Sequence, residues 1–335
     1  MPDIMPVEAP VLQVDDLTVR FRRRGMDVAA VNGVSFALAR GETLTILGES
    51  GSGKSVSLKA LMGLLPDYAQ IEGDVWLDGK PVLELPPAEL AKLRGSAVSM
   101  IFQEPMAALD PVYTIGEQIA ETIVQHEAVS RATAMRRTLD LLDHVKIPSA
   151  ARRMKNYPHE LSGGMRQRAM IALALACSPS VLLADEPTTA LDVTVQIQIL
   201  LLLRQLQEEF GMAIVFVTHD VGAAAEISDR IAVMYAGRFV ETATTREIMR
   251  SPRHPYTEGL LASTVHGGLR GRVLETIPGA PPNLAHLPQG CAFAPRCRHA
   301  REICAHGEVP VTVSPTGAMV RCVRAAPVPA QEVSA

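Results

Sequence analysis

The sequence predicts an α/β fold built on a largely parallel β-sheet that helices cover on both faces. The main observation is that short apolar runs alternate with helical patterns of ten or more residues, which is typical of successive βαβ units. The second is composition: 47% of the 335 residues are hydrophobic and 20% are charged, so the chain can bury a sizeable core. At roughly 100–200 residues per domain, this length predicts about two domains, or one large domain with an appendage.

The first third of the chain reads as strands and turns, with a hairpin at 75–79. Between about 115 and 154 the pattern becomes helical and glycine becomes scarce, which predicts an inserted helical subdomain. From about residue 251 the chain is rich in proline, glycine and histidine, which indicates a domain boundary. We expect further strands at 12–19, 31–38, 43–47, 98–102, 181–184, 213–218 and 231–235, and long helices at 54–65, 165–177 and 193–210.

Composition and charge exclude several classes of function. The net charge of -4 provides no global basic field for nucleic acid, and 4% aromatic residues argue against a stacking platform for single strands. No apolar run approaches the roughly 20 residues of a membrane-spanning helix. The N-terminal residues, which include Asp3 and Glu8, do not resemble a signal peptide. These features predict a cytoplasmic protein that reaches a membrane only by docking to another protein.

The strongest local signal is a complete match to the phosphate-binding pattern G-x-x-x-x-G-K-[ST] between an apolar strand and a helix. Glycines let backbone N–H groups turn toward phosphate oxygens, and the following helix adds the positive end of its dipole. In this pattern Lys54 pairs with the β- and γ-phosphates and the Ser55 hydroxyl binds Mg²⁺. The alternative is a glycine-rich turn that merely connects strand to helix. The loop consists of Gly48, Glu49, Ser50, Gly51, Ser52, Gly53, Lys54 and Ser55.

A second signal is a buried strand that ends in two carboxylates, Asp185 and Glu186. In a nucleotide hydrolase, Asp185 would hold Mg²⁺ through its water shell and Glu186 would polarise the attacking water. The alternative is an acidic pair that caps the turn before Pro187. The phosphate-binding loop in the same chain favours the catalytic interpretation.

A third signal lies about 20 residues before Asp185, where Ser162, Gly163 and Gly164 open a helix. A helix start of this kind presents free N–H groups and a hydroxyl, so it forms a second anion site. One domain cannot easily bring both anion sites to a single phosphate. A head-to-tail pair of chains can, with each nucleotide held between the loop of one chain and the Ser-Gly-Gly of the other.

Together these motifs resemble the ATPase subunits of ABC transporters, over about residues 11–250. The resemblance implies a P-loop NTPase (RecA-like) parallel-sheet core with an antiparallel β-subdomain and an inserted helical subdomain at about 104–165. It identifies Gln103 as the Q-loop glutamine, Asp192 as the D-loop aspartate and His219 as the switch histidine. The signature motif, which binds ATP in trans, comprises Leu161, Ser162, Gly163, Gly164, Met165 and Gln167, with Met165 where the family more commonly has glutamine.

The same resemblance implies a role for each site residue. Glu186, His219 and Gln103 would be catalytic, and Asp192 would couple the two sites across a dimer. Phe21 would stack on adenine, although it could equally be a core residue of its hairpin. Mg²⁺ would be bound by Ser55, Gln103 and Asp185, and ATP by Phe21, Gly48, Glu49, Ser50, Gly51, Ser52, Gly53, Lys54, Ser55 and Val56.

Three further stretches resemble one branch of the family, the oligopeptide/dipeptide importers that also serve nickel and other small solutes. They are the segments 102–111 and 251–261 and the cysteine-bearing tail. The His-Pro-Tyr-Thr of the second segment is interpreted as a helix-starting turn with no chemistry of its own. The expected domains are an ATPase domain at 1–262 and a C-terminal extension with a loose tail at 263–335.

The extension contains Cys291, Cys297, Cys304 and Cys322, spaced C-x5-C-x6-C-x17-C. This spacing does not fit the tight pairs of common zinc fingers, whereas four irregularly spaced thiolates can hold an iron–sulfur cluster. Some importers with such a tail carry a four-iron cluster, so the resemblance implies a [4Fe-4S] cluster here. Zinc, free thiols and disulfides remain the alternatives.

The resemblance also implies the partners and the location. The chain would hydrolyse ATP at the cytoplasmic face of the inner membrane and energise import of di- or oligopeptides. It would pair with a second ABC ATPase, a paralogue, and would act on two membrane permease subunits and with an extracytoplasmic solute-binding protein. The alternatives are import of nickel or another small solute, an export system, or an ABC ATPase that acts on DNA or ribosomes; the acidic net charge predicts no nucleic-acid partner.

Overall fold

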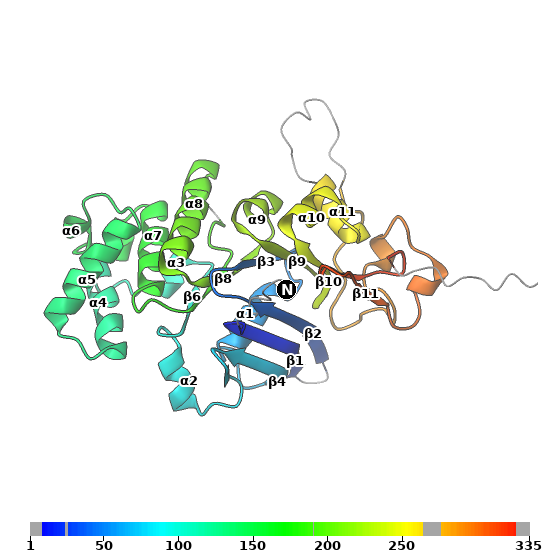
Figure 1. Cartoon of the computed structure of the whole chain (residues 1–335), viewed down its shortest axis with the longest axis horizontal. Coiled ribbons are helices and arrows are strands. Elements are labelled where there is room, and N and C mark those ends of the chain that lie inside the picture. The colour runs from blue at the N-terminus through cyan, green and yellow to red at the C-terminus, as the bar shows by residue number, and fades with distance from the viewer. Residues whose placement is uncertain (1–8, 24–25, 190, 264–275, 326–335) are drawn as a thin grey trace, which may run out of the picture.

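Figure 1 shows the computed structural model of the chain, which describes residues 9–23, 26–189, 191–263 and 276–325. The molecule is elongated, with a helical subdomain at one end, two β-sheets in the middle and the C-terminal extension at the other end. The predicted fold class, α/β with a parallel-sheet core, is confirmed. Among the described residues, no helix combines the length and the apolar character needed to span a bilayer.

The larger sheet has eight strands: β3 (Thr43–Leu47), β6 (Val98–Ile101), β7 (Val181–Asp185), β8 (Ala213–Thr218), β9 (Arg230–Tyr235), β10 (Arg238–Thr244), β11 (Val311–Val313) and β12 (Met319–Arg321). Their order is β11-β12-β10-β9-β3-β8-β7-β6. The strands from β9 to β6 run parallel, and β10, β12 and β11 continue the sheet as antiparallel strands. The carboxyl ends of β3, β7 and β8 therefore meet at one edge, where the predicted site residues follow.

Both faces of the parallel strands are buried, which explains why these strands are continuous apolar runs. Leu182 and Ile214 pack into the cluster that contains helices α7 (Gly163–Ala174), α8 (Val193–Phe210) and α9 (Val221–Ile227). Their neighbours Leu183 and Val215 point to the other face, toward α1 (Lys54–Leu61) and the smaller sheet. The period-two alternation of the strands thus builds two cores, one on each side of the sheet.

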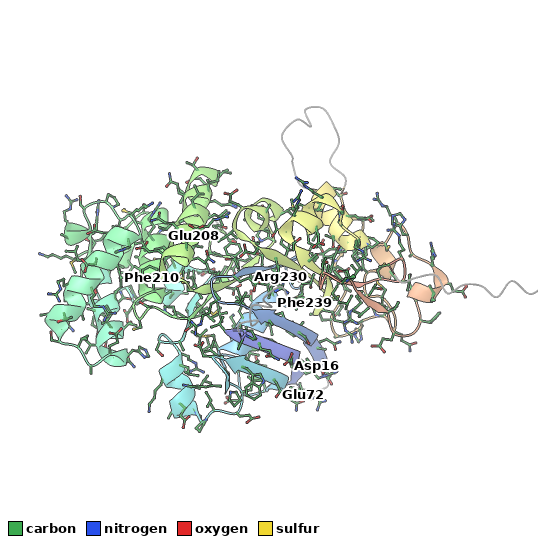
Figure 2. The ribbon with its side chains drawn as sticks, in the orientation of Figure 1. Asp16, Glu72, Glu208, Phe210, Arg230 and Phe239 are labelled. Atoms are coloured by element: carbon green, nitrogen blue, oxygen red, sulfur yellow. The ribbon has the colours of Figure 1, made fainter. Side chains whose placement is uncertain are left out.

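The smaller sheet is antiparallel, with the order β2-β1-β4-β5. Its strands are β1 (Leu12–Arg23), β2 (Met26–Leu38), β4 (Ala69–Leu77) and β5 (Lys80–Pro81), so the hairpin expected at 75–79 is present. The two sheets meet where Phe36 of β2 contacts Phe239 of β10, with ring centroids 6.2 Å apart. Figure 2 labels Phe239 above this sheet, and Asp16 at its edge, where β1 contains a bulge and Asp16 has a φ of 51°.

The helical subdomain packs at the β6 edge of the larger sheet. It consists of α3 (Pro105–Ala108), α4 (Ile115–His126), α5 (Arg131–His144), α6 (Ala150–Arg153), the short η1 (Pro158–Glu160) and the start of α7. Thr114 and Ser130 cap α4 and α5, each by accepting a hydrogen bond from a backbone N–H in the first turn. Outside the subdomain, α2 (Pro87–Leu93) follows the smaller sheet.

The C-terminal residues extend the larger sheet. After α10 (Thr245–Arg250) and α11 (Pro255–Ala262), the chain forms the short helices η2 (Ala294–Arg296) and η3 (Glu302–Cys304) and then β11 and β12. Strand β12 pairs with β10 through Glu241 and Val320, so the extension shares a sheet with the ATPase core. Neither β10 nor these two strands were predicted from the sequence. Strands β11 and β12 have only three residues each, too few to show an alternating pattern.

Three helix boundaries differ from the sequence predictions, one of them the end of α7, which is Ala174 instead of residue 177. Helix α1 ends at Leu61 instead of residue 65, because Gly63 adopts a positive φ of 58° just beyond its end. Helix α7 begins at Gly163 instead of residue 165, because Ser162 caps it by accepting a hydrogen bond from the Met165 N–H. The predicted bounds of α8 and β8 agree with the structure.

Candidate active site

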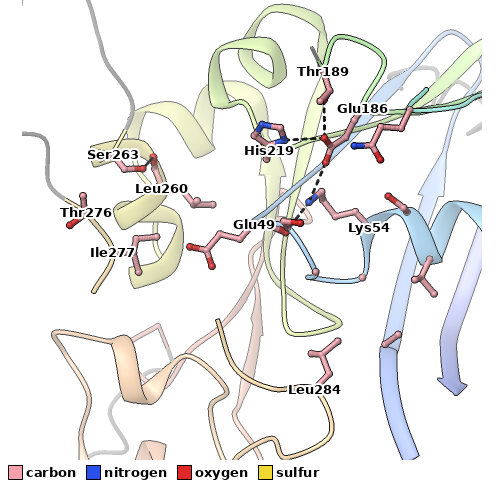
Figure 3. A pocket seen from close by; sticks show the side chains of 17 residues that line it. Glu49, Lys54, Glu186, Thr189, His219, Leu260, Ser263, Thr276, Ile277 and Leu284 are labelled. Atoms are coloured by element: carbon pink, nitrogen blue, oxygen red, sulfur yellow. Dashed lines mark hydrogen bonds and ion pairs between the residues drawn. The ribbon is translucent and has the colours of Figure 1, made fainter. Parts of the chain in front are cut away.

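A cavity of about 780 Å³ lies at the carboxyl edge of the larger sheet and brings together most of the residues predicted for catalysis and for ATP or Mg²⁺ binding within one chain. Figure 3 shows this cavity, with Lys54, Glu186, Thr189 and His219 joined by hydrogen bonds and ion pairs. A cavity of this size is large enough for a nucleotide. Ten predicted residues line it: Glu49, Ser50, Gly51, Gly53, Lys54, Ser55, Val56, Gln103, Glu186 and His219.

The phosphate-binding loop runs from the end of β3 to the start of α1. A Cβ at Gly48 would lie 2.3 Å from the carbonyl oxygen of Met234, and a Cβ at Gly53 would lie equally close to that of Ala30. Gly53 also has a φ of 107°, which side-chain-bearing residues rarely adopt. Both positions therefore require glycine, and this explains why the loop can turn its backbone inward at the helix start.

Lys54 is buried, with 4% of its side chain exposed, and its ammonium group lies inside the loop. Its Nζ donates hydrogen bonds to the carbonyl oxygens of Gly48 and Glu49, at 2.8 and 2.9 Å, and lies 3.9 Å from Oε1 of Glu186. Burial lowers the pKa of Lys54, and the nearby carboxylates of Glu186 and Asp185 oppose that shift. A phosphate group would supply the buried ammonium with an anionic partner.

Ser55 and Asp185 form a pair of oxygen ligands. The Ser55 hydroxyl donates a 2.7 Å hydrogen bond to Oδ1 of Asp185, which lies buried at the end of β7. Burial raises the pKa of Asp185, while the hydrogen bond from Ser55 and the charge of Lys59 favour the carboxylate. Adjacent hydroxyl and carboxylate oxygens are the donors that Mg²⁺ prefers, so these two residues fit the predicted Mg²⁺ site.

Glu186 follows Asp185 in a left-handed conformation, with a φ of 45°. Its backbone N–H bonds to the carbonyl of Val217, and its carboxylate turns into the cavity. There Oε2 accepts a 2.9 Å hydrogen bond from the Thr189 hydroxyl and lies 3.1 Å from Nδ1 of His219. A carboxylate held at the wall of a cavity, beside an imidazole and facing a lysine, is placed to take a proton from water bound there.

The remaining two catalytic candidates are more exposed. The His219 side chain, which follows β8, is 57% exposed, and Gln103 follows β6 on the same edge of the sheet. Both line the cavity: His219 lies beside Glu186, and Gln103 lies next to the start of the helical subdomain. Exposure leaves both side chains free to reorient toward a bound nucleotide.

The structure does not bring the signature motif to this cavity. Of its described residues, none lines the cavity, although Ser162 and Gly163 are exposed at the N-terminus of α7. Gly164 packs against Val195 of α8, and Asp192 caps α8 by accepting a 3.0 Å hydrogen bond from the Val195 N–H. Both motifs therefore lie on the surface of the chain, outside its own nucleotide cavity.

Four other residues predicted for the nucleotide and Mg²⁺ site also lie outside the cavity lining. Gly48 and Ser52 are buried within the loop, and Asp185 is buried at the end of β7. Phe21 lies on β1 with its ring 6.0 Å from that of Tyr68, and it packs against the core of the smaller sheet. This packing agrees with the core interpretation of Phe21, and its stacking on adenine stays a prediction.

Helix α11 and the C-terminal extension also contribute to the cavity, which was not predicted from the sequence. Leu260 of α11 and four residues of the extension line it, opposite Lys54 and Glu186 (Figure 3). The four are Ser263, Thr276, Ile277 and Leu284. The His-Pro-Tyr-Thr segment does begin a helix, since the buried His254 caps α11. Its tyrosine, however, also contacts the phosphate-binding loop, because the Tyr256 hydroxyl accepts a 2.9 Å hydrogen bond from the Glu49 N–H. The only sequence signal for this contribution is the apolar character of residues 255–262, which indicates that one face of this helix is buried.

The four extension cysteines, Cys291, Cys297, Cys304 and Cys322, line one small cavity, and all are free thiols. The Cys297 and Cys304 sulfurs accept hydrogen bonds from backbone N–H groups, at 3.4 and 3.5 Å. Burial raises the pKa of the Cys291 and Cys297 thiols. Within the described residues, however, no group of three or more His, Cys, Asp or Glu side chains is arranged to hold a metal ion.

Comparison with protein families agrees with this site. A family model described as "ABC transporter" matches residues 31–189, and one described as "Oligopeptide/dipeptide transporter, C-terminal region" matches residues 240–304. The oligopeptide transport ATP-binding protein OppD of Salmonella typhimurium is 52% identical over 294 residues, which are 88% of each chain. The dipeptide transport ATP-binding protein DppD of Bacillus subtilis is 47% identical over 296 residues, again 88% of each chain.

Solved structures show the same fold. The ATP-binding cassette MJ0796, in a structure described as a dimeric post-hydrolysis state bound to ADP and Pi, has a TM-score of 0.63 and 31% identity, and the match covers 70% of this chain and 99% of that one. The cbiO1 protein of Clostridium perfringens, described as part of the ABC transporter complex cbiONQ, has a TM-score of 0.62 and 26% identity, with coverages of 73% and 92%.

Proposed function

This chain belongs to the ATP-binding proteins of the ABC transporter family, in the branch with the oligopeptide/dipeptide C-terminal region, and from that premise we propose that it energises import of di- and oligopeptides. The chain is an ATPase. One observation carries the proposal: the cavity that contains Lys54, Glu186 and His219 is lined on its far side by residues of the C-terminal region typical of the peptide-transport branch.

The cavity residues divide the chemistry between them. Lys54 and the loop N–H groups bind the phosphates, and Glu186 takes a proton from the attacking water. Ser55 and Asp185 would hold Mg²⁺, which neutralises charge on the β- and γ-phosphate oxygens when bound. His219 holds the Glu186 carboxylate in place and reaches the γ-phosphate, while Gln103 links the cavity to the helical subdomain.

Closing the nucleotide site around ATP would require a second ATPase chain. The supporting observation is that Ser162 and Gly163 are exposed outside their own cavity, with helix N–H groups that can bind a phosphate. We infer a head-to-tail pair in which each nucleotide lies between one chain's loop and the other's signature, and a paralogue is the expected partner. Asp192, next to the signature on α8, would couple the two sites.

Separate membrane subunits would move the solute across the bilayer. No helix of the described residues can span a bilayer, so the pore would be supplied by two permease subunits, with an external binding protein that delivers the peptide. The chain would bind as a peripheral subunit at the cytoplasmic face. Closure of the ATP-bound pair would rotate the helical subdomain, which Gln103 adjoins, against a permease, and hydrolysis would reopen the pair.

The test is uptake by cells that lack this gene. We expect loss of labelled tripeptide uptake, restored by the wild-type gene and not by the Glu186→Gln variant. Uptake of labelled Ni²⁺ is measured in the same strains. Loss of nickel uptake with unchanged peptide uptake would replace peptides by nickel as the cargo, and unchanged uptake of both would contradict the proposal.

We also propose that Cys291, Cys297, Cys304 and Cys322 bind a [4Fe-4S] cluster, on the strength of their common cavity and the N–H donors to two of the sulfurs. Their present arrangement is not that of a metal site, so binding would require the four thiols to rearrange. The test is iron analysis and visible absorbance of anaerobically purified protein. A colourless, iron-free protein with four titratable extension thiols would reject the cluster.

A further inference from the structure

Glu49 places a carboxylate inside the phosphate-binding loop, where it lines the nucleotide cavity. A negative charge at this position repels the triphosphate of ATP, and in a partly buried site water screens this repulsion poorly. A loop that binds a polyanion therefore needs either a neutral residue here or a cation that pairs with the carboxylate. The structure contains such a cation, on a segment far away in the sequence.

Arg296 of the extension forms a bidentate ion pair with Glu49. Its Nη1 and Nη2 donate to Oε2 and Oε1 of Glu49, at 2.7 and 3.0 Å, across 247 positions of the chain. The arginine side chain is only 6% exposed, compared with 25% for the glutamate. Figure 3 shows the Glu49 side chain directed away from Lys54, toward the extension. The pair thus neutralises the carboxylate and holds it on the side of the cavity away from Lys54.

Three other residues fix the Arg296 guanidinium. Its Nε donates a 2.9 Å hydrogen bond to the Pro278 carbonyl, and Nη1 lies 3.4 Å from the Tyr235 hydroxyl. Its Cζ lies about 6 Å from the ring centroids of Tyr235 and Phe293. A guanidinium held by a carbonyl, a hydroxyl and two aromatic rings has one orientation, and that orientation matches the carboxylate fork.

The extension side also holds the backbone of Glu49. The hydroxyl of Tyr256, which is fully buried, accepts the Glu49 N–H, so Glu49 is held through both its backbone and its side chain. The loop conformation at this position therefore depends on residues of α11 and the extension, although the loop itself matches the phosphate-binding pattern without them.

We propose that Arg296 is a positioning residue for ATP binding, which neutralises Glu49 and keeps its carboxylate away from the phosphates. The extension is then part of the nucleotide site. This inference rests on the ATPase activity alone, so it stands or falls independently of the peptide cargo.

The test is ATP affinity, measured by calorimetry with Mg-ATP on the full-length chain carrying Glu186→Gln to prevent turnover. We expect Arg296→Ala to weaken binding about tenfold or more, because the unpaired carboxylate then faces the phosphates. Adding Glu49→Gln to Arg296→Ala should restore the affinity to within about threefold of the parent, because the repulsive charge is gone. Glu49→Gln alone should bind at least as tightly as the parent.

Two more variants sharpen the result. Arg296→Lys should bind with intermediate affinity, because an ammonium keeps the charge but loses the bidentate geometry. The matched control is Arg298→Ala, an exposed arginine of the same segment that pairs with Glu258 and not with the loop. Its ATP affinity should equal that of the parent.

The inference fails if Arg296→Ala binds ATP like the parent, or if the double variant binds as weakly as Arg296→Ala alone. The second result would assign Arg296 a purely structural role. Should Arg296→Ala not fold, Glu49→Gln decides the matter, since a tenfold loss of affinity in that variant would mean that the carboxylate itself is needed for binding.

Discussion

The Ser55 hydroxyl donates a 2.7 Å hydrogen bond to Asp185, which joins the first turn of α1 to the end of β7 across 130 positions of the chain. The phosphate-binding loop and the acidic pair thereby become one site, with hydroxyl and carboxylate oxygens side by side. The same contact links the Mg²⁺ ligands to Glu186, the next residue, whose carboxylate faces Lys54 and His219.

Glu186→Gln should keep ATP binding and reduce turnover by a factor on the order of 10²–10⁴, because an amide cannot accept the proton of the attacking water. The measurement is ATPase rate alongside ATP affinity in the purified transporter complex. Near-normal turnover would show that another group is the base.

Lys54→Ala should weaken ATP binding more than it slows hydrolysis of the ATP that is bound. The buried ammonium, which now bonds to two carbonyls of its own loop, is the group placed to pair with the phosphates. Equilibrium binding of Mg-ATP to the full chain checks this, and an unchanged affinity together with a reduced rate would contradict it.

Asp185→Asn should raise the unfolding temperature of the nucleotide-free protein. It should also reduce the further rise in unfolding temperature that Mg-ATP causes. Burial raises the pKa of Asp185, so the charged form costs stability above that pKa, and the cost disappears as the pH falls through it. An asparagine removes the charge and can still accept the hydrogen bond from Ser55. At pH 7 without nucleotide, we expect calorimetry to show an unfolding temperature about 2 °C higher or more. A lower unfolding temperature, or an undiminished shift on adding Mg-ATP, would argue against this assignment.

His254→Asn should reduce the loss of unfolding free energy that occurs as the pH falls below about 6.5. Burial lowers the pKa of His254 to about 4, so the unfolded chain binds more protons and stability falls as the pH drops from about 6.5 toward 4. Asparagine can accept the Tyr256 N–H as His254 Nδ1 does, but it does not titrate. Urea unfolding at pH 7 and pH 5 should show the wild type losing more stability than the variant; equal losses would exclude His254 as the cause.

A disulfide should form across the proposed dimer seam. In the Glu186→Gln chain with Mg-ATP, a cysteine at Ser50 should crosslink to one at Ser162 of a second copy, or at the matching serine of a copurifying ATPase subunit. Both serines are exposed and lie in the two motifs that would share a phosphate. Chains with only one of the two introduced cysteines serve as controls. Crosslinking that does not depend on ATP, or none at all, would contradict the head-to-tail pair.

Short-range patterns in the sequence were sufficient to predict the α/β class, the phosphate-binding loop and the acidic pair. Gly48 and Gly53 illustrate the reason. Neither position has room for a Cβ, so the spacing of the two glycines in the sequence indicates the conformation of the loop. The adjacent Asp185 and Glu186 were predicted in the same way, from a buried strand that ends in charge. Helix ends were less accurate, because caps such as Ser162 outweigh the apolar period.

The local motifs, and with them the family, could therefore be predicted from the order of the amino acids alone. Which of those motifs share a cavity and which lie on a surface depends on the fold. The structure also shows that β12 joins the core sheet and that Arg296 and Tyr256 reach Glu49. The physical reason is that a motif depends on neighbours a few residues away, whereas a contact across 247 positions depends on how complete elements pack, which the periodicity of a single segment does not encode.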